Sequence, residues 1–375
     1  MILIIKKNLY LCSGHQTFEI RLDMRKKILI VVAFLTAAIG VKAQKVQVVD
    51  DEGMGIPLVS ILTEDGVMIG TTNLDGFFDM AGAQKVVVTH VAYKPLTISA
   101  ATIKNGRVVM ENQDYSIGEV TITPKQYIYV ETYYRVYVYR NDSLCYFLTS
   151  IMPNAYDPQK KKREHGSYYH ACAEYAPKLG VAVNWGARAQ RLRAGLVQTG
   201  GLSDKYLKDK YYITATENSP NHKVFSNPKG LVGNCIISNG QSHLTLDAGK
   251  VQMYVNEAKG QTKQLKLRQE KGYQYQYSLI YIGDDGKDYD VSNFVMKSDH
   301  WEFNDKKGHV KFIIETYAVD HAYINKVEWK DKKNELKQKY KNAQKLSKLE
   351  EYEKQHNIPA LAPTVRQAIL KLKQQ

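Results

Sequence analysis

The clearest local signal in this chain is the segment Gly70-Thr71-Thr72-Asn73-Leu74-Asp75-Gly76-Phe77-Phe78. The side chains of Asn73 and Asp75 favour a tight turn because they can bond to nearby backbone groups. Gly76 supplies the positive φ that such a turn requires. Phe77 or Phe78 then falls on the buried face of the following strand. The segment therefore predicts a strand, a tight turn and a second strand.

Three further blocks surround this segment. They are Asp50-Asp51-Glu52-Gly53 with Gly55-Ile56-Pro57-Leu58-Val59-Ser60-Ile61, then Thr89-His90-Val91-Ala92-Tyr93, and finally Ile117-Gly118-Glu119-Val120-Thr121-Ile122. Together, the four blocks resemble the carboxypeptidase-regulatory-like domain of Bacteroidota envelope proteins over about residues 45–123. Asn73 stands where Asp is commoner in that family, and Ala92 replaces its usual glycine. The resemblance implies a seven-stranded, transthyretin-like β-sandwich that is not itself a catalyst. Short runs of β-branched residues separated by Gly, Asp and Asn favour the same fold over residues 44–123.

Residues 1–43 carry the features of a secretory signal. Met24-Arg25-Lys26-Lys27 is positively charged, and Ile28–Val41 is apolar but short for a membrane span. Val41-Lys42-Ala43 fits a cleavage site. We therefore predict that the true start is Met24 and that cleavage follows Ala43, with an uncleaved membrane anchor as the alternative. The mature chain is expected to be exported, soluble, and periplasmic or associated with the outer membrane.

The positive charge of the chain is concentrated at its two ends. Residues 1–43 hold seven Lys/Arg and two Asp/Glu, so their removal lowers the formal net charge from +14 to +9. Residues 329–375 hold twelve Lys/Arg and five Asp/Glu, which is +7 of that remainder. The body of the chain is close to neutral, and this pattern argues against nucleic acid as a partner.

Residues 124–328 predict a Tyr-rich antiparallel β domain, either a half-barrel or a sandwich. Residues 126–140 alternate over a length that demands a bend or a bulge, with Tyr127, Tyr129, Glu131, Tyr133, Arg135, Tyr137 and Tyr139 on one face. Tyr273–Tyr281 repeats the pattern, and Asp305-Lys306-Lys307-Gly308 predicts a hairpin turn. Residues 176–234 are less regular, and Asn218–Gly233 within them is rich in Asn, Pro, Gly and Ser, so we expect an irregular insertion at 176–234.

Residues 329–375 predict a basic, amphipathic helical tail. A helix is expected over Lys330–Gln355, with a narrow apolar stripe of Leu336, Tyr340, Ala343, Leu346, Leu349 and Tyr352. Pro363-Thr364 predicts the start of a final helix with Val365, Ala368, Ile369 and Leu372 on one side. The tail either docks on the β domain or contacts an anionic membrane surface or a protein partner.

A search for catalytic and metal-binding motifs finds neither a zinc-peptidase pattern, nor a nucleophile elbow, nor a phosphate-binding loop. Alternation places Tyr168, His170, Cys172 and Glu174 on one face, a weak metal-site candidate that structural side chains explain better. If Leu144–Ile151 and Ser167–Tyr175 form a hairpin, Cys145 and Cys172 fall near the same register and could form a disulfide. We expect no catalytic residues, no metal and no cofactor.

The sequence thus leaves two classes of function. The favoured one is a non-enzymatic envelope protein that binds a glycan, a peptide or an envelope partner. Its ligand-binding candidates are tyrosines and an arginine on exposed strand faces, where aromatic rings stack on ligands at low entropic cost: Tyr133, Arg135, Tyr137, Tyr275 and Tyr277. The other interpretation is that these tyrosines only pack a sheet face against the tail helices. The alternative is a hydrolase or glycan-processing enzyme with paired carboxylates in the second domain, for example among Asp284, Asp285, Asp288 and Asp290.

Overall fold

A computed structural model describes residues 45–80, 82–103, 105–113, 127–159, 162–163, 171–176, 214–283, 291–339 and 345–372. The expected signal peptide and the block at residues 117–122 lie outside these ranges. Residues Gln44–Gln375 form one compact unit, and the expectation of a mainly β protein is confirmed. Among the described residues, no helix is long and apolar enough to cross a membrane.

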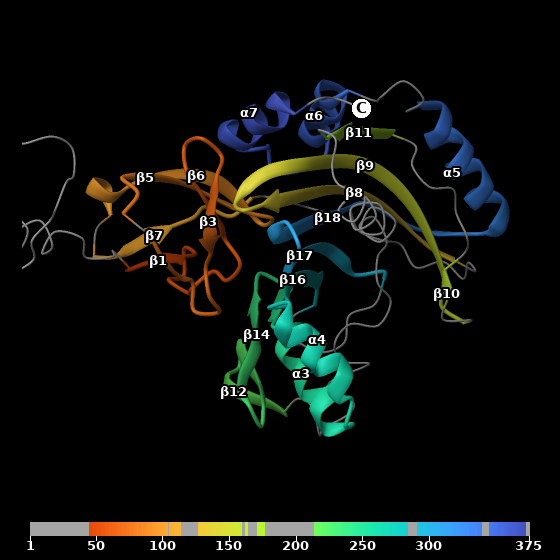
Figure 1. Cartoon of the computed structure of the whole chain (residues 1–375). Coiled ribbons are helices and arrows are strands. Elements are labelled where there is room, and N and C mark those ends of the chain that lie inside the picture. Colours follow the sequence, from red (N-terminus) through yellow and green to blue (C-terminus); the bar gives the residue numbers. More distant parts are fainter. Residues whose placement is uncertain are drawn as a thin grey trace, which may run out of the picture. The chain divides into compact units, whose positions relative to one another are not determined.

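The N-terminal part of this unit is a sandwich of two small sheets (Figure 1). One sheet has the order β4-β1-β7, and the other has the order β3-β2-β5-β6. All pairs are antiparallel except β1 with β7. The strands are β1 (Lys45–Val49), β2 (Ser60–Leu62), β3 (Met68–Thr71), β4 (Phe77–Asp79), β5 (Lys85–His90), β6 (Tyr93–Ser99) and β7 (Arg107–Val109), with a 3₁₀ turn at Ala100–Thr102.

The predicted turn between β3 and β4 is confirmed, with Asn73 as the residue whose side chain bonds to its backbone. Asn73 Oδ1 accepts hydrogen bonds from the backbone N–H groups of Asp75 at 3.0 Å and Phe77 at 2.8 Å. Gly76 has φ +78°, and Phe78 is buried. Thr72 ties the turn to the loop before β2, because its buried hydroxyl donates to the Ile56 carbonyl at 2.7 Å. Side-chain bonds and a left-handed glycine thus fix this corner of the sandwich.

Gly76→Ala is expected to destabilise the protein by about 2–3 kcal/mol, because it combines a positive φ with a steric clash. A Cβ at Gly76 would lie 2.4 Å from the Val48 carbonyl oxygen. The matched control is Gly82→Ala, which has the same φ of +78° and open space around its Cβ, and should cost only about 1 kcal/mol. Urea unfolding of both variants measures the difference; equal losses would show that the contact with Val48 is unimportant.

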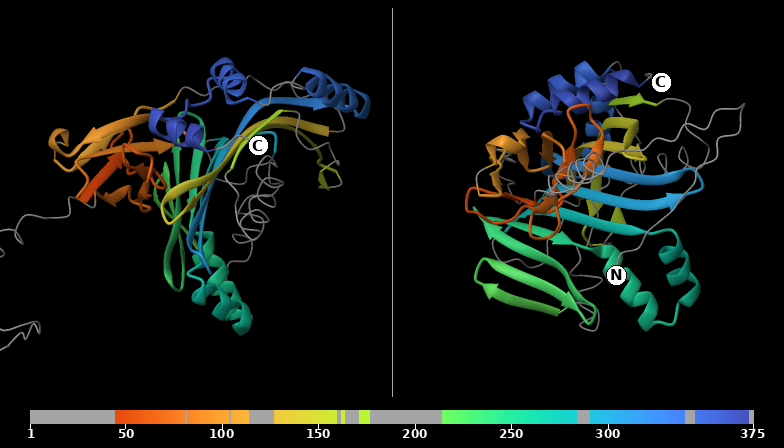
Figure 2. Two further views of the ribbon diagram at one scale, coloured as in Figure 1. Left: turned by 45° about the horizontal axis from the view of Figure 1, so that its top comes forward. Right: turned by 60° about the vertical axis from the view of Figure 1, so that its left-hand side comes forward.

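The second part is a large curved sheet of eleven strands. Its order is β10-β9-β8-β18-β17-β16-β15-β14-β13-β12, and β11 also pairs with β9. Figure 2 shows the pronounced curvature of its long strands. The strands are β8 (Tyr127–Arg140), β9 (Ser143–Asp157), β10 (Lys162–Arg163), β11 (Ala171–Tyr175), β12 (Thr214–Ser219), β13 (His222–Asn227), β14 (Gly230–Ser238), β15 (Gln241–Leu246), β16 (Gln274–Ile282), β17 (Phe294–Asp305) and β18 (Gly308–Ile324).

Several expectations for this sheet are confirmed. The alternating segment at 126–140 is the long strand β8, and its pairing with β9 shifts register between Val138 and Tyr139 as a bulge requires. The predicted hairpin at residues 305–308 joins β17 to β18, with Asp305 opposite Gly308. The described strands of this part lie in one sheet rather than in the two layers of a sandwich.

The expected irregular insertion at residues 176–234 is wrong for its second half. Residues 214–234 contribute β12, β13 and the start of β14, which pair antiparallel as a meander. The residues that suggested a loop, such as Pro220 and Pro228, lie in the hairpin turns between these strands. Residues 177–213 lie outside the described ranges.

Helices lie on both sides of the large sheet (Figures 1 and 2). Helices α3 (Ala248–Ala258) and α4 (Thr262–Glu270) connect β15 to β16, and α3 contacts β16. The C-terminal helices are α5 (Lys326–Lys339), α6 (Leu346–Gln355) and α7 (Pro363–Lys371), all of which contact β9. Helix α7 begins at Pro363 as expected; its N-cap is Ala362, and no side chain caps it.

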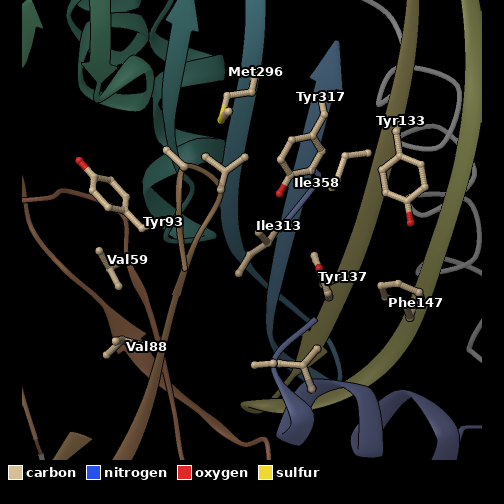
Figure 3. Close-up of a cluster of buried hydrophobic side chains, with 14 of the residues drawn as sticks. Val59, Val88, Tyr93, Tyr133, Tyr137, Phe147, Met296, Ile313, Tyr317 and Ile358 are labelled. Atoms are coloured by element: carbon tan, nitrogen blue, oxygen red, sulfur yellow. The ribbon is translucent and has the colours of Figure 1, made fainter. Parts of the chain in front are cut away.

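The sandwich, the large sheet and the tail helices share one hydrophobic cluster (Figure 3). This cluster runs from Val88 of the sandwich through Tyr133 and Ile313 of the sheet to Leu349 and Ile369 of the tail. A backbone hydrogen bond also joins the first two parts, because the Met68 N–H donates to the Asp142 carbonyl at 2.9 Å. The regions that the sequence separates at residues 123 and 328 therefore form one packed body.

Candidate functional site

The face of β8 that carries the tyrosines is buried, which corrects the expectation that it is exposed. Tyr133, Arg135 and Tyr137 are 0%, 2% and 6% exposed. The apolar stripe of the tail covers them: Leu349 and Tyr352 are buried in the same cluster, and the rings of Tyr133 and Tyr352 stack with centroids 5.7 Å apart. The tail therefore docks on the sheet, and these three residues offer no free surface to a ligand.

Tyr275 and Tyr277 lie on the opposite face of the sheet from Tyr133, Arg135 and Tyr137. Tyr277 of β16 pairs with Asp299 of β17, Asp299 pairs with Ile314 of β18, and Ile314 pairs with Val136 of β8. Residues paired in this way lie on the same face of the sheet, so Tyr277 shares the face of Val136. Tyr277 is buried in the cluster that includes α3. The Tyr275 hydroxyl donates to Asp299 Oδ1 at 2.7 Å, and its ring lies 4.7 Å from that of Trp301. The five predicted ligand-binding residues are therefore divided between two buried faces.

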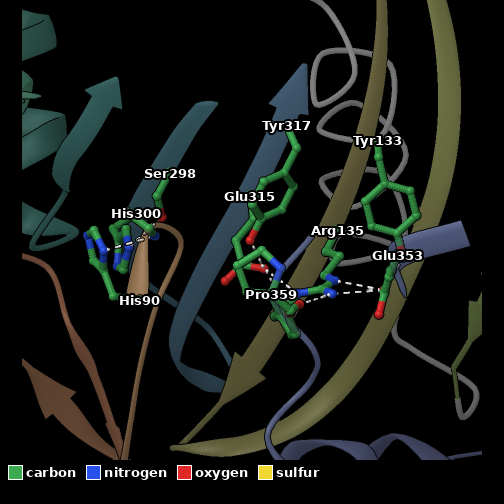
Figure 4. A network of polar contacts seen from close by, with 11 residues as sticks. His90, Tyr133, Arg135, Ser298, His300, Glu315, Tyr317, Glu353 and Pro359 are labelled. Carbon is green, nitrogen blue, oxygen red and sulfur yellow. Dashed lines mark hydrogen bonds and ion pairs between the residues drawn. The ribbon is translucent and has the colours of Figure 1, made fainter. Parts of the chain in front are cut away.

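Arg135 is the centre of a buried polar network that fastens the tail to the sheet (Figure 4). Its guanidinium Nη1 lies 3.3 Å from Glu315 Oε2, and its Nη2 lies 2.8 Å from Glu353 Oε1. Nη2 also donates to the Pro359 carbonyl at 2.6 Å. Burial is the largest single influence on the pKa of Arg135 and would lower it, but the Glu353 carboxylate and the neighbouring tyrosines together outweigh burial and hold that pKa above its usual value.

Tyrosine hydroxyls complete this network. Tyr133 donates to Glu353, and Tyr137 donates to Glu315 Oε2 at 3.0 Å. Each carboxylate of the network thus accepts from a phenol as well as from the guanidinium. Such an arrangement satisfies buried charge and holds the tail in place.

Glu131 forms a second buried contact between sheet and tail. Its carboxylate accepts hydrogen bonds from the Tyr352 hydroxyl at 2.6 Å and from the Tyr129 hydroxyl at 2.9 Å. Burial raises the pKa of the Glu131 carboxyl, although these two hydrogen bonds oppose the shift. The raised pKa arises from enclosure beneath the tail, and Glu131 lines neither of the cavities described below.

The first cavity, which we call the inner cavity, lies beside Arg135 and has a volume of about 30 Å³. Arg135 and Glu315 line it from the sheet, residues 359–362 line it from the tail, and His90 lines it from the sandwich. A volume of this size holds one or two water molecules. The inner cavity therefore has room for water within the core.

The second cavity lies between the sandwich and the large sheet, and we call it the junction pocket. The sandwich contributes the acidic turn Asp50-Asp51-Glu52, together with His90, Tyr93 and Asn112. The sheet contributes polar residues from β14, β15 and β16, which are Ser238, His243, Thr245 and Ser278. Asp51 and Glu52 are exposed, so the pocket has a charged side towards solvent and a polar interior.

Histidines from three strands meet behind the junction pocket. His90 of β5 and His300 of β17 are 8% and 7% exposed. Burial lowers the pKa of His90 to about 3, with further contributions from His300 and His243. Burial also lowers the pKa of His300 and of His243 to about 4. All three imidazoles are therefore neutral at pH 7.

Sequence reasoning did not select the residues of this region. His90 occurs in one of the blocks that carry the family resemblance, but His243 and His300 have no motif around them. Their association depends on how β5, β15 and β17 are placed in three dimensions. Glu315 and Glu353, the partners of Arg135, were missed for the same reason.

The structure also corrects the expected alignment of Cys145 with Cys172. Strand β11 does pair with β9, but Cys172 lies opposite Ser150, and the paired stretch of β9 ends at Phe147. Cys145 lies outside that stretch and is a free thiol. Burial raises the pKa of the Cys145 thiol to about 11, so it is protonated at neutral pH.

Cys145 is expected to react slowly with iodoacetamide at pH 7.5 in the folded protein and fully once the protein is unfolded without reductant, because only the thiolate attacks. Mass spectrometry of the alkylated peptides measures both states. Resistance of Cys145 to alkylation in the unfolded, unreduced chain would reveal a disulfide.

The two other predicted sites are the weak metal-site candidate and the aspartates considered for catalysis. Among the residues that the structure describes, no group of three or more His, Cys, Asp or Glu side chains is placed to hold a metal ion. Residues 164–170 and 284–290 lie outside the described ranges, and so do Tyr168, His170 and the four aspartates considered for catalysis.

Comparisons with protein-family models, with curated proteins and with solved structures found no match.

Proposed function

We propose that this chain is a non-enzymatic binding protein of the cell envelope, and that its ligand site is the junction pocket. The observation that carries this proposal is the convergence of an acidic turn, two histidines and several hydroxyls in a pocket between two parts of the protein. Ligand sites occur preferentially at such junctions and use a few convergent polar groups for specificity. The site thus differs from the tyrosine faces that the sequence favoured.

A hydrolytic function is less favoured by the described residues. The buried carboxylates of the sheet are engaged by Arg135 and by tyrosine hydroxyls. An acid–base pair needs room for a substrate between its two carboxyl groups. No described observation favours this second candidate.

Our proposal also covers the protein family of the N-terminal module and the cellular location of the chain. A sandwich of three-stranded and four-stranded sheets with a tight β3–β4 turn supports a carboxypeptidase-regulatory-like, transthyretin-like module over residues 45–123. That module and the predicted signal support export to the periplasm or the outer membrane. Leu349, Tyr352 and Ile369 of the tail are buried against the sheet, so a contact of the tail with an anionic surface would use its lysines, together with exposed residues such as Leu370.

A binding panel tests the proposed function. The purified chain is titrated with neutral, acidic and amino-bearing oligosaccharides and with short peptides, by calorimetry and by analysis of products. We expect saturable binding of at least one class without chemical change. Release of a shortened glycan or peptide would instead establish the enzymatic alternative, and absence of binding across the panel would contradict the proposal.

A further inference from the structure

Basic side chains from two parts of the chain come together where helix α4 leads into β16 (Figure 1). Residues 259–271 hold five Lys/Arg and one Glu, a net charge of +4, although the body of the chain as a whole is close to neutral. The Asn304 N–H of β17 donates to the Lys271 carbonyl at 2.7 Å, so the end of α4 lies beside the β17–β18 turn. That turn adds the exposed Lys306 and Lys307. The cations therefore belong to one surface rather than to a run along a single helix.

The carboxylates that neighbour these cations are already engaged. Glu270 pairs with Lys266 at 3.8 Å, and the two oxygens of Asp305 bond to Arg140 at 2.8 Å. Among the residues that the structure describes, no ion pair involves the four remaining cations, which are Arg268, Lys271, Lys306 and Lys307. Uncompensated positive charge at one place on an otherwise near-neutral body favours an anionic ligand.

Aromatic rings lie directly beside these cations. Arg268 Cζ lies 4.6 Å from the centroid of the Tyr273 ring. The Tyr273 ring meets the Trp301 ring edge to face, with centroids 6.3 Å apart, and Tyr275 packs on Trp301 in turn. Tyr273 and Trp301 are only half-buried, unlike Tyr277 further along the same face, so part of each ring is open to solvent. Their contacts with one another hold the two rings in place before any ligand arrives.

This aromatic–basic surface, made of Arg268, Lys271, Tyr273, Trp301, Lys306 and Lys307, is separate from the junction pocket. Side chains alternate between the faces of a sheet, so Tyr275, which packs on Trp301, lies on the opposite face from Ser278 of the junction pocket. A lipid bilayer is a less suitable partner, because insertion needs a broad exposed apolar face. The described residues of α4 expose one large apolar side chain, Leu267.

We propose that the aromatic–basic surface binds an acidic oligosaccharide, such as one built from uronic acids. A sugar ring stacks on the open part of Tyr273 and Trp301, and the carboxylates of the sugar pair with the neighbouring cations. Aromatic rings supply stacking area at low entropic cost, and Arg and Lys supply the charge-assisted hydrogen bonds that carboxylates accept. The inference goes beyond the proposed function, because it adds a second site that does not depend on the junction pocket.

Four probes separate the contributions of charge, sugar ring and membrane. They are tetragalacturonate, its fully methyl-esterified form without charge, tetraglutamate without sugar rings, and vesicles of phosphatidylglycerol and phosphatidylcholine in equal parts. Calorimetry and tryptophan fluorescence of the purified chain follow the binding. We expect saturable binding of tetragalacturonate that weakens with added salt, and at least roughly fivefold weaker binding of the ester and of tetraglutamate. Equal binding of either, binding of the vesicles alone, or no binding of tetragalacturonate would overturn the inference.

The double variant Lys306→Gln/Lys307→Gln tests the surface directly. Both side chains are exposed in a hairpin turn, so folding should be unaffected, and binding of tetragalacturonate should weaken roughly fivefold to tenfold. Lys326→Gln/Lys330→Gln is the matched control, since it removes two exposed lysines from α5 and should leave the affinity unchanged. An unchanged affinity in the turn variant, or an equal loss in the control, would refute the inference. Binding of another ligand that neither variant affects would leave the proposed function intact.

Discussion

Arg135→Met is expected to destabilise the folded protein by about 3–5 kcal/mol, because it leaves buried carboxylates without their cation. Arg135 is 2% exposed and pairs with both Glu315 and Glu353, and the Pro359 carbonyl would lose its donor as well. Since Glu353 and Pro359 belong to the tail, the tail should also become more accessible to protease. Urea unfolding and limited proteolysis measure the two effects.

The matched control for this variant is Arg140→Met. Arg140 bonds both oxygens of Asp305 at 2.8 Å, so its geometry is at least as good as that of Arg135. Its side chain and that of Asp305 are 18% and 22% exposed, so solvent screens the pair, and we expect a loss of about 1 kcal/mol. If Arg135→Met were no worse than Arg140→Met, the buried network would not be what holds the tail.

Acidification is expected to weaken the protein strongly between pH 6.5 and pH 4, because His90 and His300 are buried in their neutral form. Their folded-state pKa values of about 3 and about 4 lie below the ordinary value of 6.5. The unfolded chain therefore takes up protons first as the pH falls. The stabilisation is complete above pH 6.5 and is lost on the way down to the folded-state values.

The expected size is about 2 kcal/mol per histidine at pH 5, from about 1.4 kcal/mol per pH unit below 6.5. Urea unfolding at pH 7 and pH 5 measures this loss. His90→Gln and His300→Gln should each reduce the pH dependence, because glutamine does not titrate. His309→Gln is the control, since it replaces a histidine of the same sheet whose side chain is 34% exposed rather than buried. The same dependence in all three variants would assign the acid sensitivity to other groups.

Local patterns in the sequence predicted the strands and turns of this fold better than they predicted what packs against each of them. The Asn73–Gly76 turn and the hairpin at residues 305–308 depend on neighbouring residues, so both were predictable. The alternation of β8 separated its two faces correctly. It could not show that the tyrosine face is covered, because an exposed aromatic face and one beneath a helix have the same periodicity.

The wrong prediction at residues 214–234 and the missed junction pocket also have physical causes. Residues 214–234 form short strands joined by tight turns, so turn-forming residues occur nearly as densely there as in a loop. The junction pocket combines a turn near residue 50 with strands more than 150 residues later in the chain, and no local pattern connects them. Residues that meet only after folding leave no signal in a single sequence.

The shared core has a consequence for the biogenesis of this protein. The residues that cover the tyrosine face of β8, among them Leu349, Tyr352 and Ile369, leave the ribosome long after β8 itself. Until they arrive, that face and the Arg135 guanidinium have no cover. The core beneath this face can therefore pack completely only after the tail helices have been made.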